Sequence, residues 1–209
     1  MNNRLNVIKI FCLFLAIFIA GCGGSGSSSS GGGAGSVSSS GGTGLDSSHP
    51  NVVVRVSKSF YDVFGSSISQ LRSELRSKGP GSFFARTIST IAYQYRTTGN
   101  CSVQNATITV TSNLLLPRWT ARGGASSGTV SQWNRFETAL ERHELNHARF
   151  AIAEAEQFAR IILGMSAPGC AALDAAIDQA HKNSLARLTA RDEDYDDRTG
   201  HGSSEGARL

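Results

Sequence analysis

The chain carries two hydrophobic patterns, and the first lies in its middle third. Residues 52–56 (VVVRV) are β-branched at nearly every position, which is typical of a strand. Residues 66–78 place apolar side chains at helical spacing, and Gly-Pro-Gly at 79–81 ends that helix. Residues 83–96 and 102–116 are again rich in β-branched and aromatic residues, so the pattern predicts two more strands.

The second pattern is helical and lies in the C-terminal part of the chain. Across residues 133–162 the apolar side chains recur at steps of three and four, with charged residues on the opposite face. A break at 164–169 precedes a second helix at 171–190, whereas the tail at 192–209 is polar and has no periodicity. Strands followed by a helical hairpin predict an α+β domain at 49–209 with a small, mostly antiparallel sheet.

The first residues are not part of that domain. Two positive residues precede an uninterrupted apolar run at 10–20, which is typical of a secretory signal peptide. A membrane-spanning helix is the weaker interpretation, because it needs about 20 apolar residues. The run ends in Ile-Ala-Gly-Cys, which resembles a bacterial lipobox. We therefore interpret residues 1–21 as a lipoprotein signal peptide and Cys22 as the lipidated first residue of the mature chain, with a plain signal peptide as the alternative.

The segment 22–48 begins with the lipidated cysteine and otherwise consists almost wholly of glycine and serine. Because it cannot bury apolar surface, it predicts a disordered tether with a reach on the order of 25–30 Å. Several acyl chains on Cys22 would anchor the domain to a membrane of the bacterial cell envelope, on its periplasmic or surface face. Loss of the leader removes Arg4 and Lys9 and no acidic residue, so the formal charge falls from +4 to +2. The scattered basic residues give no support for a nucleic-acid partner.

Two of the four cysteines remain for the domain, because Cys12 leaves with the signal peptide and Cys22 takes lipid. In an exported protein, Cys101 and Cys170 are expected to form a disulfide. Closing a loop of about 70 residues would stabilise the fold by roughly 4 kcal/mol if the effect is one of chain entropy. A cysteine nucleophile is the competing interpretation, and an oxidising compartment disfavours it.

The candidate chemistry lies in the segment HELNH, residues 143–147. Positions i and i+4 of a helix share a face, so His143 and His147 can direct two imidazoles at one ion, the HExxH arrangement of zinc hydrolases. Glu144 would lie beside the ion and accept the proton of a zinc-bound water. The alternative is a pair of hydrogen-bonded core histidines with a surface glutamate. Because two buried imidazoles on adjacent turns need a common partner, we predict a Zn²⁺ site.

A catalytic zinc usually has three protein ligands and one open position. The metzincin pattern HExxHxxGxxH is excluded, because Phe150 and Ala153 occupy its glycine and histidine positions. An antiparallel hairpin would place His181 about 9 Å along the helix axis from His147, too far to share an ion. Pairing with Glu154 is the expected role of His181.

The segment that approaches the site in that register is 191–202, which leaves the second helix. It holds a histidine, five carboxylates and a tyrosine. His201 lies between two glycines that let the backbone bend inward, so we predict it as the third zinc ligand. Asp196 is expected to orient a ligand from outside, and the Tyr195 hydroxyl to help stabilise an oxyanion. The other carboxylates are interpreted as a solvated acidic tail.

Several residues together carry a resemblance to a known family. They are Cys101, Pro117, Trp133, Phe136, HELNH, Cys170 and the ending Tyr195-Asp196-x-x-Thr199-x-His201-Gly202. In these residues the chain resembles the bacterial domain of unknown function 922, whose members are described as predicted secreted zinc-dependent proteases. The resemblance covers roughly residues 51–202, and it implies a zincin-like domain with a protease-like metal site.

The sequence therefore predicts a zinc metallopeptidase, held in the envelope by its lipid anchor, that acts on a peptide or protein substrate. Zinc and Glu144 would activate the attacking water. One alternative is a metal-binding or structural lipoprotein whose metal site is closed. Another is a two-metal helical-bundle site built from Glu144-x-x-His147 and Asp178-x-x-His181.

Overall fold

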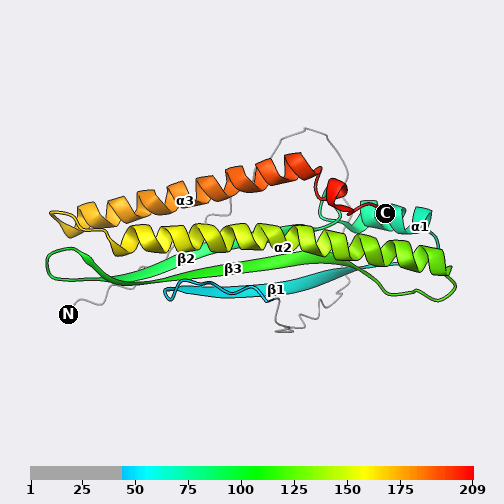
Figure 1. Ribbon diagram of the computed structural model, residues 1–209, viewed down its shortest axis with the longest axis horizontal. Helices are drawn as coiled ribbons and strands as arrows, with labels where there is room; N and C mark the ends of the chain where they lie inside the picture. Colours follow the sequence, from blue (N-terminus) through cyan, green and yellow to red (C-terminus); the bar gives the residue numbers. More distant parts are fainter. Residues whose placement is uncertain (1–43) are drawn as a thin grey trace, which may run out of the picture.

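The computed structural model describes residues 44–209, so the predicted signal peptide, Cys22 and most of the tether lie outside the described residues. Figure 1 shows α2 lying along the sheet and α3 returning along α2, which confirms the α+β class and the helical hairpin. The elements in chain order are β1 (Val52–Val63), α1 (Ile68–Lys78), β2 (Arg86–Thr97), β3 (Val103–Trp119), α2 (Ser127–Leu163), α3 (Cys170–Thr199) and the short 3-10 helix η1 (Ser203–Glu205).

The sheet has three strands in the order β1-β3-β2. β2 pairs with β3 in antiparallel register, as predicted for consecutive strands. β1, however, lies parallel to β3, from Val52 beside Ile108 to Val63 beside Trp119. The prediction of a mostly antiparallel sheet was therefore wrong. Parallel strands need a long crossover connection, and α1 together with β2 provides one between β1 and β3.

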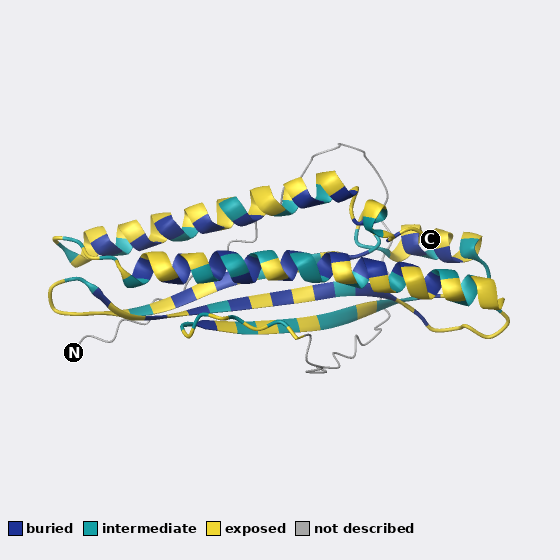
Figure 2. Cartoon of the chain, viewed as in Figure 1, coloured by how far each residue is buried: buried dark blue, intermediate teal, exposed yellow. Residues whose placement is uncertain are grey.

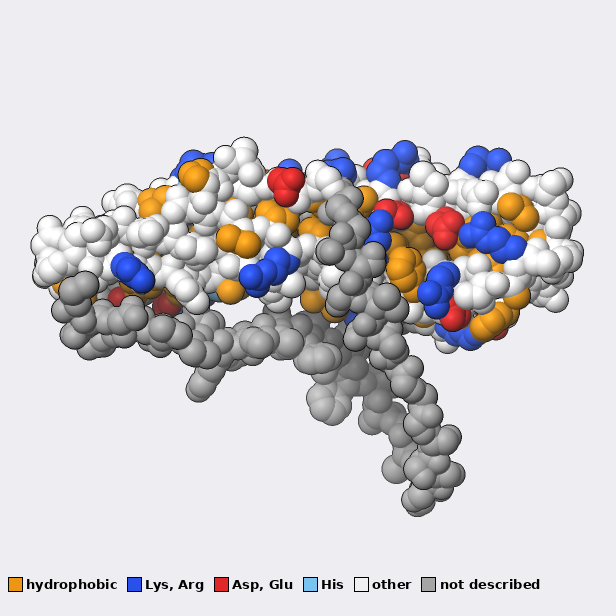
Figure 3. Space-filling model, turned by 90° about the horizontal axis from the view of Figure 1, so that it is seen from below, with side chains coloured by type: hydrophobic (Ala, Val, Ile, Leu, Met, Phe, Trp, Pro, Cys, Tyr) orange, Lys and Arg blue, Asp and Glu red, His pale blue; other side chains and the backbone are white. Residues whose placement is uncertain are grey.

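The outer face of the sheet is polar and carries no covering helix among the described residues. Ser57, Thr111 and Asn113 point outward there and are exposed. Figure 3 shows this side of the molecule, on which charged and apolar side chains lie scattered. An antiparallel pair with one buried and one solvated face explains the alternating pattern of β2 and β3.

The core lies between the other face of the sheet and the two long helices. Figure 2 shows the buried side of α2, which Trp133, Phe136 and Phe158 fill without exposed area. Full burial of such a side chain stabilises the fold by about 1.5–3 kcal/mol. Although α2 has 37 residues, no helix within residues 44–209 is long and apolar enough to cross a membrane.

The predicted disulfide is confirmed. Cys101 and Cys170 are joined, with their Cα atoms 4.9 Å apart, and the two residues are 69 positions apart in sequence. Cys101 lies in the turn between β2 and β3, and Cys170 is the first residue of α3. The covalent link therefore fixes the beginning of α3 against the end of the sheet.

α3 is longer than predicted, and this difference decides the geometry of the site. The sequence pattern ended the helix at residue 190, but the helix continues to Thr199. Its last turns bury only Tyr195 and Thr199, so the apolar stripe there is too sparse to show as a period. The residues at 192–197, predicted to form a solvated tail, are helical and face α2 with part of their surface.

Candidate metal centre

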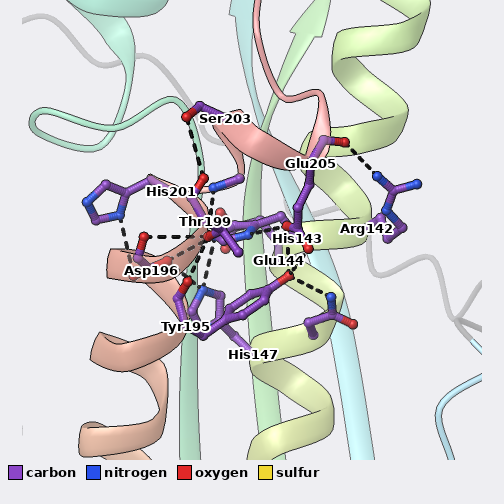
Figure 4. Close-up of polar contacts among 12 residues, drawn as sticks. Arg142, His143, Glu144, His147, Tyr195, Asp196, Thr199, His201, Ser203 and Glu205 are labelled. Carbon is purple, nitrogen blue, oxygen red and sulfur yellow. Dashed lines mark hydrogen bonds and ion pairs between the residues drawn. The ribbon is translucent and has the colours of Figure 1, made fainter.

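Three elements meet around the two histidines of α2 (Figure 4). His143 and His147 lie one helical turn apart and are buried, because their side of α2 faces α3. Asp192 and Asp196 lie one turn apart on the last part of α3 and face them. Glu205 arrives from η1, beyond the end of α3. Two pairs at i, i+4 spacing on antiparallel helices therefore face each other.

One nitrogen of each histidine converges with Asp196. The Nε2 atoms of His143 and His147 are 3.3 Å apart, and they lie 3.0 and 3.2 Å from Asp196 Oδ1. These three atoms form the one group of potential metal ligands within residues 44–209. Ligands of a tetrahedral zinc, at bonds of about 2.0–2.1 Å, lie about 3.3 Å from one another. The two histidines and the aspartate match the ligand types and the spacing of a three-ligand Zn²⁺ site.

The other nitrogen of each histidine contacts a carboxylate. His143 Nδ1 lies 3.0 Å from Glu205 Oε2, and His147 Nδ1 lies 2.8 Å from Asp192 Oδ1. An ionised carboxylate can only accept, so each Nδ1 donates its N–H in these contacts. Each Nε2 is then the ring atom that would lose its proton to bind an ion beside Asp196. Histidines that bind metals almost always donate their second N–H in this way.

The negative charge around His147 favours a cation at the centre. Burial alone would lower the pKa of His147, but the hydrogen bond to Asp192 and the charges of Asp192, Asp196 and Glu144 outweigh it and raise that pKa. A proton is therefore held to higher pH than usual when no metal is bound. Since metal must displace that proton, zinc affinity should increase with pH.

Glu144 lies beside the centre and is 5% exposed. Its Oε2 accepts a hydrogen bond of 2.7 Å from the Thr87 hydroxyl of β2. Burial raises the pKa of Glu144, and the Thr87 hydrogen bond and the charges of His147 and His143 offset part of that rise. A carboxylate whose pKa is shifted toward neutrality is suited to proton transfer. Glu144 thus lies next to the three potential ligand atoms, but its carboxylate is bound to Thr87 and is not one of them.

His201 was predicted to join the two histidines and Asp196 to lie outside them, but the structure brings Asp196 to the histidines and leaves His201 outside. The His201 side chain is 49% exposed, its ring packs against Phe83 at 4.4 Å between centroids, and its Nδ1 lies 3.5 Å from Asp196 Oδ2. The third member of the ligand group is Asp196 instead. The cause is the longer α3, which carries Asp196 onto the histidines and leaves His201 beyond the helix end, where it contacts the outer oxygen of Asp196.

Tyr195 supports the site from the side. Its ring stacks on His143, with 4.7 Å between centroids and 16° between planes. The hydroxyl accepts a hydrogen bond from Asn146 and donates one to Glu205. Burial raises the pKa of Tyr195 to about 12, so the phenol stays protonated. The hydroxyl is thus engaged away from the three converging ligand atoms.

The second histidine motif is not part of the site. His181 Nε2 lies 2.8 Å from the backbone oxygen of Ile91, to which it donates. The predicted pair of His181 with Glu154 was wrong, because Glu154 binds Arg187 at 3.1 Å. Asp178 accepts a hydrogen bond from a tyrosine of β2. The structure therefore does not assemble the two-metal arrangement.

Sequence reasoning missed three residues of the centre. Asp192 and Asp196 have the same i, i+4 spacing as the two histidines. Asp192 could therefore have been predicted if the second helix had been extended to residue 199. Thr87 and Glu205 contact the site from β2 and η1. No local pattern marks either of them, because their contacts depend on tertiary packing.

Gly202 allows the chain to turn back against His143. Its φ is +77°, and a Cβ there would lie 2.9 Å from His143 Cγ. We expect Gly202→Ala to lower stability by about 1–3 kcal/mol through backbone strain, and also to weaken zinc binding by displacing the imidazole. Gly124→Ala is the matched control, because Gly124 has φ +82° and a Cβ added there would meet no atom within 4 Å. Thermal unfolding and zinc titration of both variants test this, and equal zinc affinities would contradict it.

Comparison with known proteins gives one finding. Residues 58–202 match the family described as bacterial protein of unknown function (DUF922). The match covers the elements from the second half of β1 to the end of α3. No curated protein and no solved structure matches the chain significantly.

Proposed function

The chain belongs to the DUF922 family, whose description assigns no activity, and from the site itself we propose that the protein is a zinc-dependent peptide-bond hydrolase. The observation that carries this proposal is the convergence of three potential ligand atoms. Two imidazole Nε2 atoms and a carboxylate oxygen lie 3.0–3.3 Å apart, and both Nδ1 atoms are directed at other carboxylates. Such a cluster favours a cation, and its donor set suits zinc.

The mechanism assigns separate tasks to neighbouring side chains. His143, His147 and Asp196 would hold Zn²⁺, which supplies Lewis-acid activation of water and of the scissile carbonyl. Glu144 would accept the proton of the attacking water and then pass it to the leaving amine. Tyr195 serves as a positioning residue, because its hydroxyl is already donated to Glu205.

The free edge of β2 supports a peptide as the substrate. Ile108 of β3 donates its backbone N–H to the backbone oxygen of Asn51, which precedes β1. The backbone N–H and C=O groups of every second residue of β3, counted from Ile108, therefore point toward β1. The β2 residues with backbone groups directed away from β3 are then Thr87, Ser89 and Ile91. His181 occupies the outward oxygen of Ile91, which agrees with this assignment.

The part of that edge next to Glu144 has no covering partner. Within residues 44–209, no hydrogen bond reaches the backbone N–H or C=O of Thr87 or Ser89 on this side. An extended peptide could therefore pair with β2 here, by the common mode of strand addition. The Thr87 side chain would hold Glu144 while its backbone binds substrate.

We expect Ser89→Pro to lower kcat/KM for peptide hydrolysis about tenfold, because it removes one outward N–H, and about 1.4 kcal/mol corresponds to such a factor. Proline is tolerated where an edge N–H faces solvent, so the fold should persist. Ser89→Ala is the control, because it removes the same hydroxyl bonded to Ser112 and keeps the N–H. Equal kinetics for the two variants would show that the edge does not bind substrate.

Zinc content and hydrolysis of unstructured peptides by the purified full-length chain test the proposal. We expect about one zinc per chain, peptide cleavage that a chelator abolishes and zinc restores, and tight binding of a hydroxamate at the open position. Bound zinc with neither cleavage nor hydroxamate binding would favour the alternative of a non-catalytic metal-binding envelope protein.

A further inference from the structure

The chain after α3, residues 202–209, folds back onto the metal centre, and we call it the C-terminal latch. Most of it lies beyond the region matched to the family. Figure 1 places it beside α1 and over α2. The inference rests on the proposed metal site: we propose that Glu205 is a positioning residue of that site and that the latch holds Glu205 in place.

Glu205 makes the contacts that a positioning residue needs. Its Oε2 lies 3.0 Å from His143 Nδ1 and 2.8 Å from the Tyr195 hydroxyl. The ring of Tyr195 in turn stacks on His143. Glu205 and Tyr195 therefore fix the orientation of the imidazole, with its Nε2 directed at Asp196. The carboxylate of Glu205 itself is not part of the converging ligand group.

The latch is held at its beginning by hydrogen bonds. Gly202 donates its N–H to Thr199 Oγ1 at 3.1 Å, and Thr199 donates to the Tyr195 backbone oxygen. Arg142 then donates to the backbone oxygen of Glu205 at 2.7 Å. The backbone on either side of the Glu205 side chain is thus tied to α3 and to α2.

The end of the latch is held by packing. Ala207 and Leu209 are buried in the hydrophobic cluster that contains Leu71 of α1 and Phe136 of α2. Arg72 of α1 donates to the Leu209 backbone oxygen. A side chain can hold a ligand accurately only if its own backbone is supported. The packing of Leu209 is therefore connected to the orientation of His143 through Glu205.

Zinc affinity of the full-length protein, measured by chelator competition, tests the role of Glu205. We expect Glu205→Ala to weaken zinc binding about 10–100-fold, the usual effect of losing such a partner. Glu205→Gln keeps an acceptor for Nδ1–H, so its loss should be intermediate. Glu193→Ala on the exposed side of α3 removes the same charge and should leave the affinity unchanged. An affinity for Glu205→Ala within twofold of wild type would overturn the proposal.

A nitrogen NMR spectrum of the metal-free protein gives a readout independent of zinc and of hydrolysis. The His143 Nδ1–H that Glu205 accepts should be protected from exchange and give a resolved signal in wild type, and this signal should be lost in Glu205→Ala. Leu209→Ala should weaken that signal in part and weaken zinc binding severalfold, whereas Leu209→Met should keep both close to wild type. Unchanged affinity and an unchanged Nδ1–H signal in Leu209→Ala, with Glu205→Ala defective, would overturn the latch. Absence of peptide cleavage by wild type would refute the proposed activity and leave these results standing.

Discussion

Glu144→Gln is expected to lower kcat/KM for peptide hydrolysis by about 10²–10⁴-fold, the usual contribution of a general base. Zinc affinity should stay close to that of wild type, because Glu144 lies outside the group of His143, His147 and Asp196. Glutamine has nearly the same shape and can still accept the hydrogen bond that Thr87 donates. The substitution thus removes the proton acceptor and little else.

Parallel kinetic and zinc titrations of Glu144→Gln separate the possible roles. Glu137→Gln is a suitable control, since Glu137 lies on the same helix and its one hydrogen bond among the described residues is with Arg122, at 3.5 Å. Full activity with zinc retained would exclude Glu144 as the base. Loss of zinc would mean that Glu144 is a ligand or supports one.

Asp196→Ala is expected to weaken zinc binding by more than about 100-fold, because loss of a ligand should exceed the 10–100-fold effect of losing an outer partner. His201→Ala should change the affinity only severalfold, since His201 contacts the outer oxygen of Asp196 at 3.5 Å. The two variants therefore distinguish the ligand set in the structure from the three histidines predicted by the sequence.

Asp196→Ala and His201→Ala are also expected to differ in how much added zinc raises their free energy of unfolding. A ligand that binds only the folded state at 100 times its dissociation constant stabilises the protein by about 2.7 kcal/mol. Wild type and His201→Ala should show such a rise in unfolding free energy when zinc is added, and Asp196→Ala should not. A normal rise in Asp196→Ala together with none in His201→Ala would establish His201 as the third ligand.

The parts of the candidate site whose geometry depends on a single helix or strand could be predicted from the sequence. His143, Glu144 and His147 could be predicted because four-residue spacing on a helix defines a face, whatever the rest of the fold does. The disulfide between Cys101 and Cys170 followed from counting cysteines in a chain predicted to be exported. The α+β class followed from the order of the two hydrophobic periods.

The parts that depend on two elements could not be predicted in the same way. The end of α3 is helical because of contacts that Tyr195 and Thr199 make with α2 and the latch, and its own sequence is acidic and nearly without apolar residues. Because the helix was expected to end nine residues too early, His201 was predicted at the place where the structure brings Asp196 to the histidines. Glu205 follows three residues after a glycine turn, and its position depends on tertiary contacts of the latch, among them the Arg142 hydrogen bond and the burial of Leu209.

The link between Cys101 and Cys170 sets the register of α3 on α2. It fixes the first turn of α3, while the residues that face the histidines lie in its last turns, about 40 Å away along a helix of 30 residues. A slip of α3 by one turn would bring Asp192 to the place of Asp196 and Leu188 to the place of Asp192. Because such a slip would also have to move Cys170 away from Cys101, the disulfide opposes it from the far end of the helix.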